Sequence, residues 1–342
     1  MAEKRTELGT LGEFGLIDHL TKSVQHYQPS TSKGIGDDGA VINPQGKRVV
    51  VSTDMLVEGI HFDLTYTPLK HLGYKSVVVN VSDIYAMNAQ PTQITVSIAL
   101  SNRFSVEALE ELYEGINLAC KHYQVDFVGG DTTSSRKGLI ISVTAIGLAE
   151  PEQIAYRNGA QVGDLICVTG DFGAAFLGLQ LLEREKSIYL ENPQMQPSLE
   201  GKDYLVGRLL KPEAGKPAYE FLQKASIKPT SMIDVSDGLS SEILHICRQS
   251  NVGALIEEAL VPIAHDTKVQ AIDFNLDPIT CALHGGEDYE LLFTINPNDA
   301  EKIRYELDIK IIGEIVPASD GIRLQTKGGN FHPLTAQGWQ HY

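Results

Sequence analysis

Aspartate-bearing motifs that interrupt apolar runs constrain this chain more than any other feature of its sequence. Five such motifs occur: Gly-Ile-Gly-Asp-Asp (34–38), Ser-Thr-Asp (52–54), Ser-Asp (82–83), Gly-Gly-Asp-Thr-Thr (129–133) and Asp-Val-Ser-Asp-Gly (234–238). Because most follow or interrupt a β-branched run, we expect their carboxylates at strand ends or helix starts. Gathered carboxylates repel one another and are costly to desolvate unless a cation compensates them. The pattern therefore predicts a site that holds several Mg²⁺ ions and a phosphate-bearing substrate.

Length and charge limit the class of protein further. The 342 residues are enough for two domains of ordinary size, and 42% hydrophobic with 21% charged residues is typical of a globular protein. A net charge of −16 argues against nucleic acid or an anionic membrane as the main partner. No stretch approaches the roughly 20 apolar residues of a membrane span, and no signal peptide is visible. The four cysteines are far apart in the sequence, so we expect buried thiols and a cytoplasmic protein.

The order of apolar runs predicts an α+β fold with two α/β domains. Buried strands are expected at 48–52, 76–81, 94–100, 125–128 and 139–148, with a helix from the N-cap Ser105 to about Tyr123. The pattern restarts near Glu150-Pro151, which divides the chain into domains 1–152 and 153–342. The second domain is expected to contain strands at 165–169, 253–256 and 291–295, and helices at 172–185 and after Asp237. The polar segment 187–203 is either an ordered insertion or a lid.

Most of the motifs also have an ordinary structural interpretation. Gly-Ile-Gly-Asp-Asp-Gly (34–39) matches GxGxxG in letters, but polar residues precede it and a strand follows, so the dinucleotide-binding interpretation fails. The pairs Ser82-Asp83 and Ser236-Asp237 each precede a helix-like segment, and N-capping is the stronger interpretation for each pair taken alone. Asp131 follows two glycines that allow a ligand to approach the backbone, which favours a functional role. The sequence contains no P-loop, GxSxG or HExxH motif.

Taken together, the motifs resemble the thiamine-monophosphate kinase family, within the superfamily of aminoimidazole ribonucleotide synthetase and selenophosphate synthetase. The resemblance extends from Gly12-Glu-Phe-Gly-Leu-Ile17 to Gly338-Trp339, and it includes Ser52–Gly59, Gly129–Thr133 and Gly285–Leu291. It implies ATP-dependent phosphorylation of thiamine monophosphate to thiamine diphosphate. It also implies an N-terminal domain that binds metal and ATP, whose mixed sheet pairs into a barrel in a homodimer. The C-terminal domain would be sandwich-like and would add nucleotide and substrate contacts.

The resemblance assigns a role to each matched residue. The residues that would bind several Mg²⁺ ions are Asp38, Ser52, Thr53, Asp54, Asp83, Asp131, Asp234 and Asp237. The carboxylates of Asp54, Asp83, Asp131 and Asp237 would form the catalytic centre. Contacts to ATP, the co-substrate, would come from Gly130, Asp131, Arg157 and Ser236. Thiamine monophosphate would be held by His61, Glu287 and Trp339. One departure is Asn88, where the family usually has Gly, and Asn tolerates the left-handed backbone conformation.

The chemistry of this reaction fits the residue types. The nucleophile is a phosphate oxygen that is already anionic near neutral pH, so no strong general base is needed. Positioning and charge neutralisation then carry the transfer, and we expect it to be direct, without a phosphoenzyme.

Two other functions stay open at this point. One is an ATP-dependent cyclo-ligase similar to aminoimidazole ribonucleotide synthetase, although the segments 52–62 and 285–291 fit the kinase better. The other is a non-catalytic nucleotide-binding regulator with a retained site. The selenophosphate synthetase and hydrogenase-maturation branches are disfavoured, because the first cysteine is Cys120 and the chain ends in Gln-His-Tyr.

Overall fold

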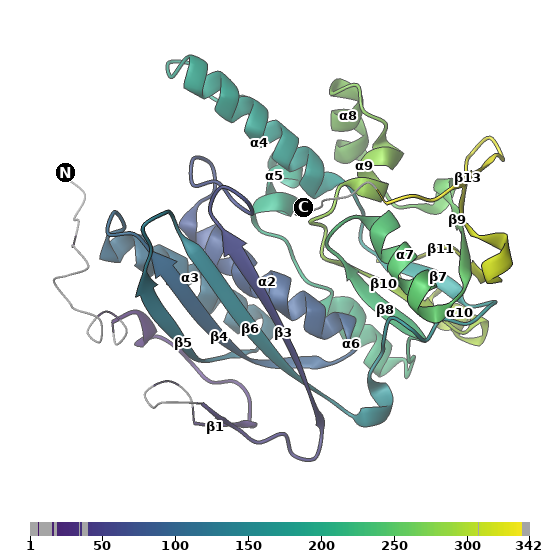
Figure 1. The fold of residues 1–342 in the computed structure, drawn as a ribbon, viewed down its shortest axis with the longest axis horizontal. Coiled ribbons are helices and arrows are strands. Elements are labelled where there is room, and N and C mark those ends of the chain that lie inside the picture. Colours follow the sequence, from purple (N-terminus) through teal and green to yellow (C-terminus); the bar gives the residue numbers. More distant parts are fainter. Residues whose placement is uncertain are drawn as a thin grey trace. The chain divides into compact units, whose positions relative to one another are not determined.

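The computed structural model describes Thr6, Leu16 and residues 19–33, 35, 40–306 and 308–336. The chain divides into two compact units. Unit 1 runs to Ile84 and continues from Ala89 to Glu152, whereas unit 2 consists of Tyr85–Asn88 and of the chain from Gln153 onward. Figure 1 labels most of the elements of both units.

Unit 1 contains a four-stranded sheet in the order β3-β6-β4-β5, in which only β4 and β5 are parallel neighbours. A small antiparallel pair, β1 and β2, precedes it. The elements are β1 (Thr31–Lys33), β2 (Val41–Ile42), β3 (Arg48–Val57), α2 (Leu69–Ala86), β4 (Gln90–Leu100), α3 (Val106–Tyr123), β5 (Asp126–Ser134) and β6 (Ile140–Ala149).

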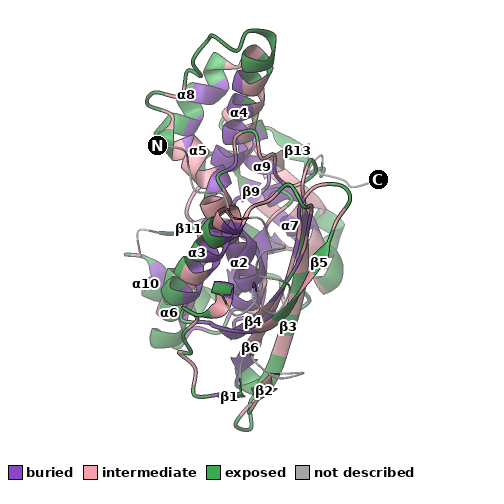
Figure 2. Cartoon of the chain, turned by 90° about the vertical axis from the view of Figure 1, so that its left-hand side faces the viewer, coloured by how far each residue is buried: buried purple, intermediate pink, exposed green. Residues whose placement is uncertain are grey.

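Helices α2 and α3 lie on one face of this sheet (Figure 1). They cross where a glycine of each helix meets the backbone of the other. A Cβ on Gly73 would lie 2.0 Å from the carbonyl oxygen of Leu112, and one on Gly115 would lie 1.9 Å from that of Lys70. Any larger side chain would therefore force the helices apart. Figure 2 colours most of α2 as buried, in agreement with full burial of its valine run 77–78.

The other face of the sheet is open within unit 1. Side chains alternate along β3, so Leu56 is buried toward the helices whereas Val49, Val51 and Met55 are exposed by 50–61%. Large apolar side chains in one row along a strand form an apolar face. Val49, Val51 and Met55 define this apolar face, which is a candidate surface for self-association.

Two expectations for unit 1 are wrong. The run 76–81 is not a strand but the middle of α2. Its β-branched residues favour a strand locally, but burial on all sides suits them equally in a helix covered by a sheet and a second helix. The pair Ser82-Asp83 consequently lies in the last turns of α2 and not at an N-cap. By contrast, the expected cap is confirmed, because Ser105 Oγ accepts a hydrogen bond from Ala108 N at 3.3 Å.

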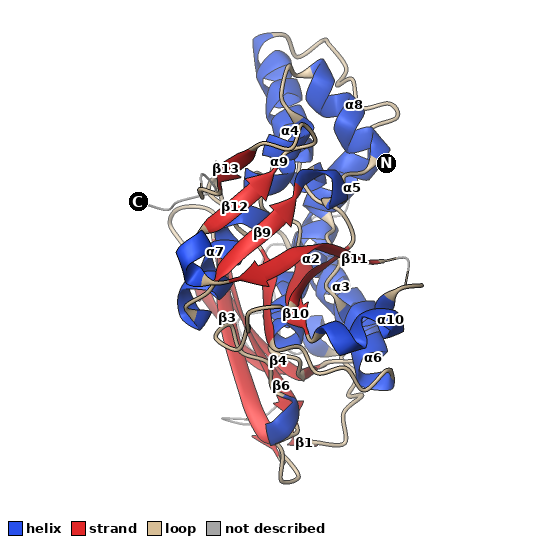
Figure 3. Ribbon diagram, turned by 90° about the vertical axis from the view of Figure 1, so that its right-hand side faces the viewer, coloured by secondary structure: helices blue, strands red, loops and turns tan. Residues whose placement is uncertain are grey.

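Unit 2 contains a seven-stranded sheet in the order β13-β12-β9-β11-β7-β10-β8, parallel only between β12 and β9. Figure 3 shows several of these strands side by side. The strands are β7 (Leu165–Thr169), β8 (Ser231–Val235), β9 (Gly253–Glu257), β10 (Glu290–Ile295), β11 (Ile309–Val316), β12 (Ile322–Gln325) and β13 (Phe331–Pro333). The helices are α4 (Ala174–Glu191), α5 (Asp203–Leu210), α6 (Lys216–Lys224), α7 (Leu239–Ser250), α8 (His265–Asp273), α9 (Pro278–His284) and α10 (Ala300–Ile303).

Two apolar cores hold unit 2 together. The larger core joins α7 and α9 to the sheet, with Val168, Leu239 and Leu292 among its buried members. The smaller core lies where α4 meets α5, around Leu177 and Leu205. Helix α4 continues to Glu191, so it includes the first residues of the segment 187–203, for which the sequence predicted either an ordered insertion or a lid. The α+β expectation is confirmed in both units, and barrel formation stays a prediction.

All four cysteines are buried and form no disulfide, as expected. In the parts of the chain that the structure describes, no helix combines the length and apolar character needed to cross a bilayer.

Candidate functional site

Strand β3 and helix α2 bring the first acidic group together. Ser52 Oγ donates a hydrogen bond to Asp83 Oδ2 at 2.5 Å, and Asp54 N donates to Asn80 Oδ1 at 2.9 Å. The side chain of Asn80 is itself fixed to the carbonyl oxygen of Ser76 at 2.9 Å. The structure thus brings together Ser52, the backbone of Asp54 and Asp83, although Ser52 and Asp83 are 31 residues apart in the sequence.

Thr53 does not join this group through its side chain. Strand alternation directs it to the opposite face of the sheet, where Thr53 Oγ1 donates to the carbonyl oxygen of Val143 at 3.0 Å. Thr144 Oγ1 lies 3.1 Å from the same hydroxyl. The expected ligand set 52–54 is therefore split by the pleat of β3.

The Gly-Gly-Asp motif lies within β5 and not at its end. A Cβ on Gly130 would lie 1.8 Å from the carbonyl oxygen of Val96 on β4, so this position accepts only glycine. The next residue, Asp131, is exposed and pairs in register with Ser97. Because β6 and β4 separate β5 from β3, Asp131 is roughly 14 Å from Asp54 across the sheet, at about 4.8 Å per strand.

In unit 2 the structure joins two motifs that are about 50 residues apart. Glu287 N donates to the carbonyl oxygen of Ser236 at 2.7 Å, and Tyr289 N donates to that of Val235 at 2.8 Å. Gly286 has φ +73°, and a Cβ there would lie 2.6 Å from the Ser236 carbonyl oxygen. The loop Gly285–Glu290 is therefore hydrogen-bonded along the end of β8, beside Asp237.

The expected capping role of Ser236-Asp237 is wrong. The N-cap of α7 is Gly238, without any side-chain cap hydrogen bond. Asp234 is buried at the end of β8, whereas Asp237 is exposed and Ser236 is half-buried. Asp237 is therefore placed before the helix without acting as its N-cap.

Glu242 is a residue of this region that the sequence motifs did not indicate. Its Oε1 accepts a hydrogen bond from Asp237 N at 3.1 Å, and its Oε2 is buried without a hydrogen-bond partner among the described residues. Burial raises the pKa of Glu242 to about 8, and the charges of Asp237 and Asp234 also raise it. The only signal in the sequence is an acidic residue in the first turn of the helix that follows the motif.

Of the remaining predicted residues, the structure describes Arg157 and His61. Arg157 is exposed, and its carbonyl oxygen accepts from Ser250 Oγ at 3.1 Å. Partial burial of His245 on α7 lowers its pKa, and the positive charge of Arg157 lowers it further. The guanidinium of Arg157 therefore lies near that helix. His61 Nδ1 accepts from Val57 N at 3.1 Å, which fixes the turn after β3. Asp38 and Trp339 lie outside the described residues.

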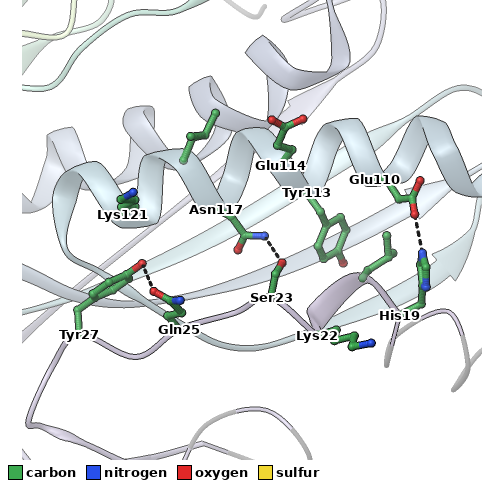
Figure 4. Close-up of a pocket in the computed structure, with 12 residues that line it drawn as sticks. His19, Lys22, Ser23, Gln25, Tyr27, Glu110, Tyr113, Glu114, Asn117 and Lys121 are labelled. Carbon is green, nitrogen blue, oxygen red and sulfur yellow. Dashed lines mark hydrogen bonds and ion pairs between the residues drawn. The ribbon is translucent and has the colours of Figure 1, made fainter.

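A cavity of about 730 Å³ lies elsewhere in unit 1, between the segment 19–27 and α3. Figure 4 shows His19 Nε2 bonded to Glu110 Oε1 at 2.6 Å, and Asn117 bonded to Ser23 Oγ at 3.3 Å. None of the predicted site residues lines it. We therefore place the candidate site on the acidic motifs and not in this cavity.

The donor chemistry of the motifs fits Mg²⁺ better than a softer metal, because every candidate ligand is an oxygen. No three His, Cys, Asp or Glu side chains in the described ranges form one metal-binding group. Mg²⁺ does not need such a cage, since it keeps several waters and binds one or two carboxylates together with substrate phosphates. The oxygen ligands thus form one group in unit 1, Ser52 with Asp54 and Asp83, and one group in unit 2, Asp234 with Asp237. Within unit 1, Asp131 on β5 lies apart from the first group.

Comparison with known proteins gives the class. The family model "AIR synthase related protein, N-terminal domain" matches residues 36–149, and the model of the C-terminal domain matches residues 161–324. The chain is also 34% identical over 335 residues to the thiamine-monophosphate kinase of Aquifex aeolicus (strain VF5), covering 98% of this chain and 99% of the relative. The chain therefore belongs to the AIR synthase related proteins and, within them, to the thiamine-monophosphate kinase family.

Solved structures agree with this assignment. The structure described as AaThiL complexed with AMPPCP and TMP has a TM-score of 0.75 at 32% identity, covering 98% of this chain and 99% of that one. The thiamine-monophosphate kinase from Stenotrophomonas maltophilia K279a has a TM-score of 0.78 at 31% identity, covering 95% and 98%. The similarity thus extends over both units.

Proposed function

We propose that this protein transfers the γ-phosphoryl group of ATP to thiamine monophosphate, giving thiamine diphosphate and ADP. The observation that carries the proposal is the similarity over nearly the whole chain to a structure that holds AMPPCP, an ATP analogue, together with TMP. The relatives named thiamine-monophosphate kinase support the same reaction.

The transfer is direct and in line. The acceptor oxygen belongs to a phosphate that is anionic near neutral pH, so the protein needs no strong base to activate it. The barrier comes from bringing two polyanions together, and positioning with charge neutralisation lowers it. The motifs are rich in oxygen ligands and contain few cationic side chains, which agrees with charge neutralisation by metal ions instead of by the protein.

Several Mg²⁺ ions complete the site. The side chains that would hold them are Ser52, Asp54 and Asp83 in unit 1, Asp131 on β5, Asp234 and Asp237 in unit 2, and Asp38. When bound, the metal would neutralise charge on the phosphoryl groups. The hydrogen bond from Ser52 to Asp83 orients that carboxylate, and Asn80 fixes the backbone of Asp54. We exclude the Thr53 hydroxyl, which bonds to Val143 on the opposite face.

The substrate contacts belong to the same proposal. Gly130, which is exposed beside Asp131, would contact a phosphate through its backbone. Arg157 and Ser236 complete the ATP contacts. Glu287, with His61 and Trp339, holds the thiamine portion, for which a carboxylate offers charge complementarity to the cationic thiazolium ring.

The protein acts as a homodimer in the cytoplasm. The apolar face of Val49, Val51 and Met55 supports pairing of the unit 1 sheets of two chains into a barrel, because burying it removes a row of large side chains from water. Four buried, unpaired thiols fit a reducing compartment. Sedimentation velocity of the wild type and of Val51→Asp tests the dimer: the charge at this face should yield monomers, and an unchanged dimer would place the interface elsewhere.

The first experiment incubates the protein with ATP, Mg²⁺ and thiamine monophosphate and measures thiamine diphosphate and ADP by chromatography. Asp131→Asn is run beside it, with Asp273→Asn as a control on the exposed end of α8. Equal amounts of the two products from wild type and control, and neither from Asp131→Asn, are expected.

Other outcomes would identify the alternatives. ATP consumption only with formylglycinamidine ribonucleotide would make the protein a cyclo-ligase. Nucleotide binding without turnover of either substrate would make it a regulator. A phosphorylated protein formed at a competent rate would contradict direct transfer.

A further inference from the structure

A buried ionic network in unit 2 lies beneath the loop Gly285–Glu290. At its centre is Arg208 of α5, whose side chain is only 16% exposed. Its Nη1 donates to Glu290 Oε1 at 2.9 Å, and its Nη2 donates to the carbonyl oxygen of Asp171 at 3.0 Å and to that of Asp288 at 3.4 Å. One guanidinium thus joins three segments: helix α5, the turn after β7, and the loop.

The same network includes more carboxylates than cations. Asp288 has no solvent exposure, and its Oδ1 lies 3.9 Å from Arg208 Nη2. Tyr204, one turn earlier on α5, donates to Asp171 Oδ2 at 2.6 Å. Within the described chain, Arg208 is the ion-pair partner of both Asp288 and Glu290, and no other cation pairs with either. Removing its charge would leave these acids buried and uncompensated.

The loop above the network has a backbone that needs support. Glu287 has φ +62° and Tyr289 has φ +54°, in the left-handed region that residues with side chains rarely adopt. Asp288, between them, points into the network, where its carboxylate accepts a hydrogen bond from Gly173 N at 3.2 Å. Such conformations persist only where the surroundings over-determine them. Arg208 holds the backbone carbonyl of Asp288 and the side chain of Glu290, the residues that follow these left-handed positions.

We propose that Arg208 is a positioning residue: by clamping Asp288 and Glu290 from below, it holds Glu287 in the conformation that binds the thiamine portion of the substrate. Tyr289 Oη donates a hydrogen bond to Glu287 Oε1 at 3.1 Å, so the position of Tyr289 also fixes the carboxylate of Glu287. The inference rests on the proposed function, because the substrate role of Glu287 belongs to it.

The main test is Arg208→Lys, which keeps the charge but replaces a planar fork by a single ammonium group. Lysine cannot bond at once to Glu290 and to the two carbonyl oxygens. We expect the KM for thiamine monophosphate to rise at least tenfold, with the KM for ATP within twofold of wild type. Arg304→Lys, an exposed arginine paired with Glu301, is the matched control and should change neither.

A double-mutant cycle separates positioning from general damage. If Arg208 acts through Glu287, then Arg208→Lys should add no more than a twofold change in KM to the Glu287→Gln variant. Equal effects of Arg208→Lys in both backgrounds, or a parallel rise of the KM for ATP and for thiamine monophosphate, would overturn the proposal.

Hydrogen exchange measured by NMR tests the clamp without any activity. The amides of Glu287 and Tyr289 should exchange at least tenfold faster in Arg208→Lys, whereas Ile315 N, which donates to Asp164 in the same unit, should not change. Unchanged exchange at Glu287 and Tyr289 would sink the proposal even if the kinase assay succeeds. Faster exchange in a protein that does not turn over thiamine monophosphate would instead reject the proposed function and leave the clamp standing.

Discussion

In unit 1, Asp83 is half-buried and its carboxylate accepts a hydrogen bond from the neutral hydroxyl of Ser52, whereas in unit 2 Asp288 and Glu290 are packed around a guanidinium. Within the described ranges, neither Asp83 nor Asp131 forms an ion pair. The chain therefore supplies the compensating cation for Asp288 and Glu290, whereas the proposed function assigns an external cation to Asp83 and Asp131. Membership of a sequence motif does not distinguish the two groups of acids, since Asp288 and Glu290 also lie in a motif, Gly285–Leu291.

The extent of burial explains why Asp288 and Glu290 are paired with Arg208 whereas Asp83 has no ion pair among the described residues. A carboxylate without solvent exposure has to be paired inside the protein or protonated, because water cannot stabilise its charge. A half-exposed carboxylate keeps part of its hydration and can exchange it for a metal ion and phosphate oxygens. We therefore interpret the unit 2 network as structural support and the unit 1 group as the part that reacts with ligands. This division predicts different effects of mutation in the two groups.

Arg208→Met should lower the free energy of unfolding by about 3–5 kcal/mol, because it leaves buried carboxylates without their cation. Urea denaturation of the variant and wild type at neutral pH measures the change. Adding Glu290→Gln should recover part of it, since the charges are then removed together. A loss below about 1 kcal/mol, the level of an exposed pair, would mean that the network is more hydrated than its burial indicates.

Asp83→Asn should lower the rate of phosphoryl transfer by roughly 100-fold or more, because a lost metal contact removes several kcal/mol of charge stabilisation. Its stability should change little, since Asn still accepts the hydrogen bond from Ser52. Kinetics over a range of Mg²⁺ concentrations, beside Asp273→Asn, check this prediction. Full activity of Asp83→Asn at ordinary Mg²⁺ would remove Asp83 from the metal site.

Asp288→Asn should change how stability depends on pH. Burial raises the pKa of Asp288 above its ordinary value, while Arg208 opposes the rise. A carboxyl whose pKa is higher in the folded state binds more protons there, so its contribution to stability falls as pH rises from the unfolded pKa toward the folded one. Relative to Asp288→Asn, the wild type should lose stability as pH rises above about 5 toward the raised folded pKa, by at most about 1.4 kcal/mol per pH unit.

Urea denaturation of both proteins at several pH values in that range gives the comparison. A difference between them that stays constant over that range would show that Arg208 keeps Asp288 ionised throughout.

Much of this architecture was predictable from local patterns. Local side-chain patterns were enough to predict several elements. These are the cap at Ser105, the strands at 94–100 and 165–169, and the helix after Asp237. Asn88 is a finer case: it adopts the expected left-handed φ of +53°, and its side chain also bonds to Gln153 and Gln223, which a glycine could not do. Such features depend on neighbours in sequence or on one residue's conformational preference.

What was not predictable depends on tertiary contacts. The valine run in α2 favours a strand until a sheet and a second helix bury it on all sides, and this shift moves Asp83 from a helix start to a helix end. The pleat of β3 separates Thr53 from its neighbours Ser52 and Asp54. Arg208 has no motif around it, and its partner Glu290 is 82 residues away, so only the fold reveals the pair.

The smallest effects should come from two hydroxyls that make equivalent contacts, Ser52 with Asp83 and Tyr204 with Asp171. Each removal costs about 1 kcal/mol where the acceptor is left buried and unpaired. Tyr204→Phe should show this loss in urea denaturation, because Asp171 Oδ1 already lacks a partner among the described residues. Ser52→Ala should lose less stability, since water replaces the hydroxyl at half-buried Asp83, but it should slow phosphoryl transfer. The reverse pattern, with Ser52→Ala the less stable and fully active, would make the unit 1 group structural and contradict the division between the two groups.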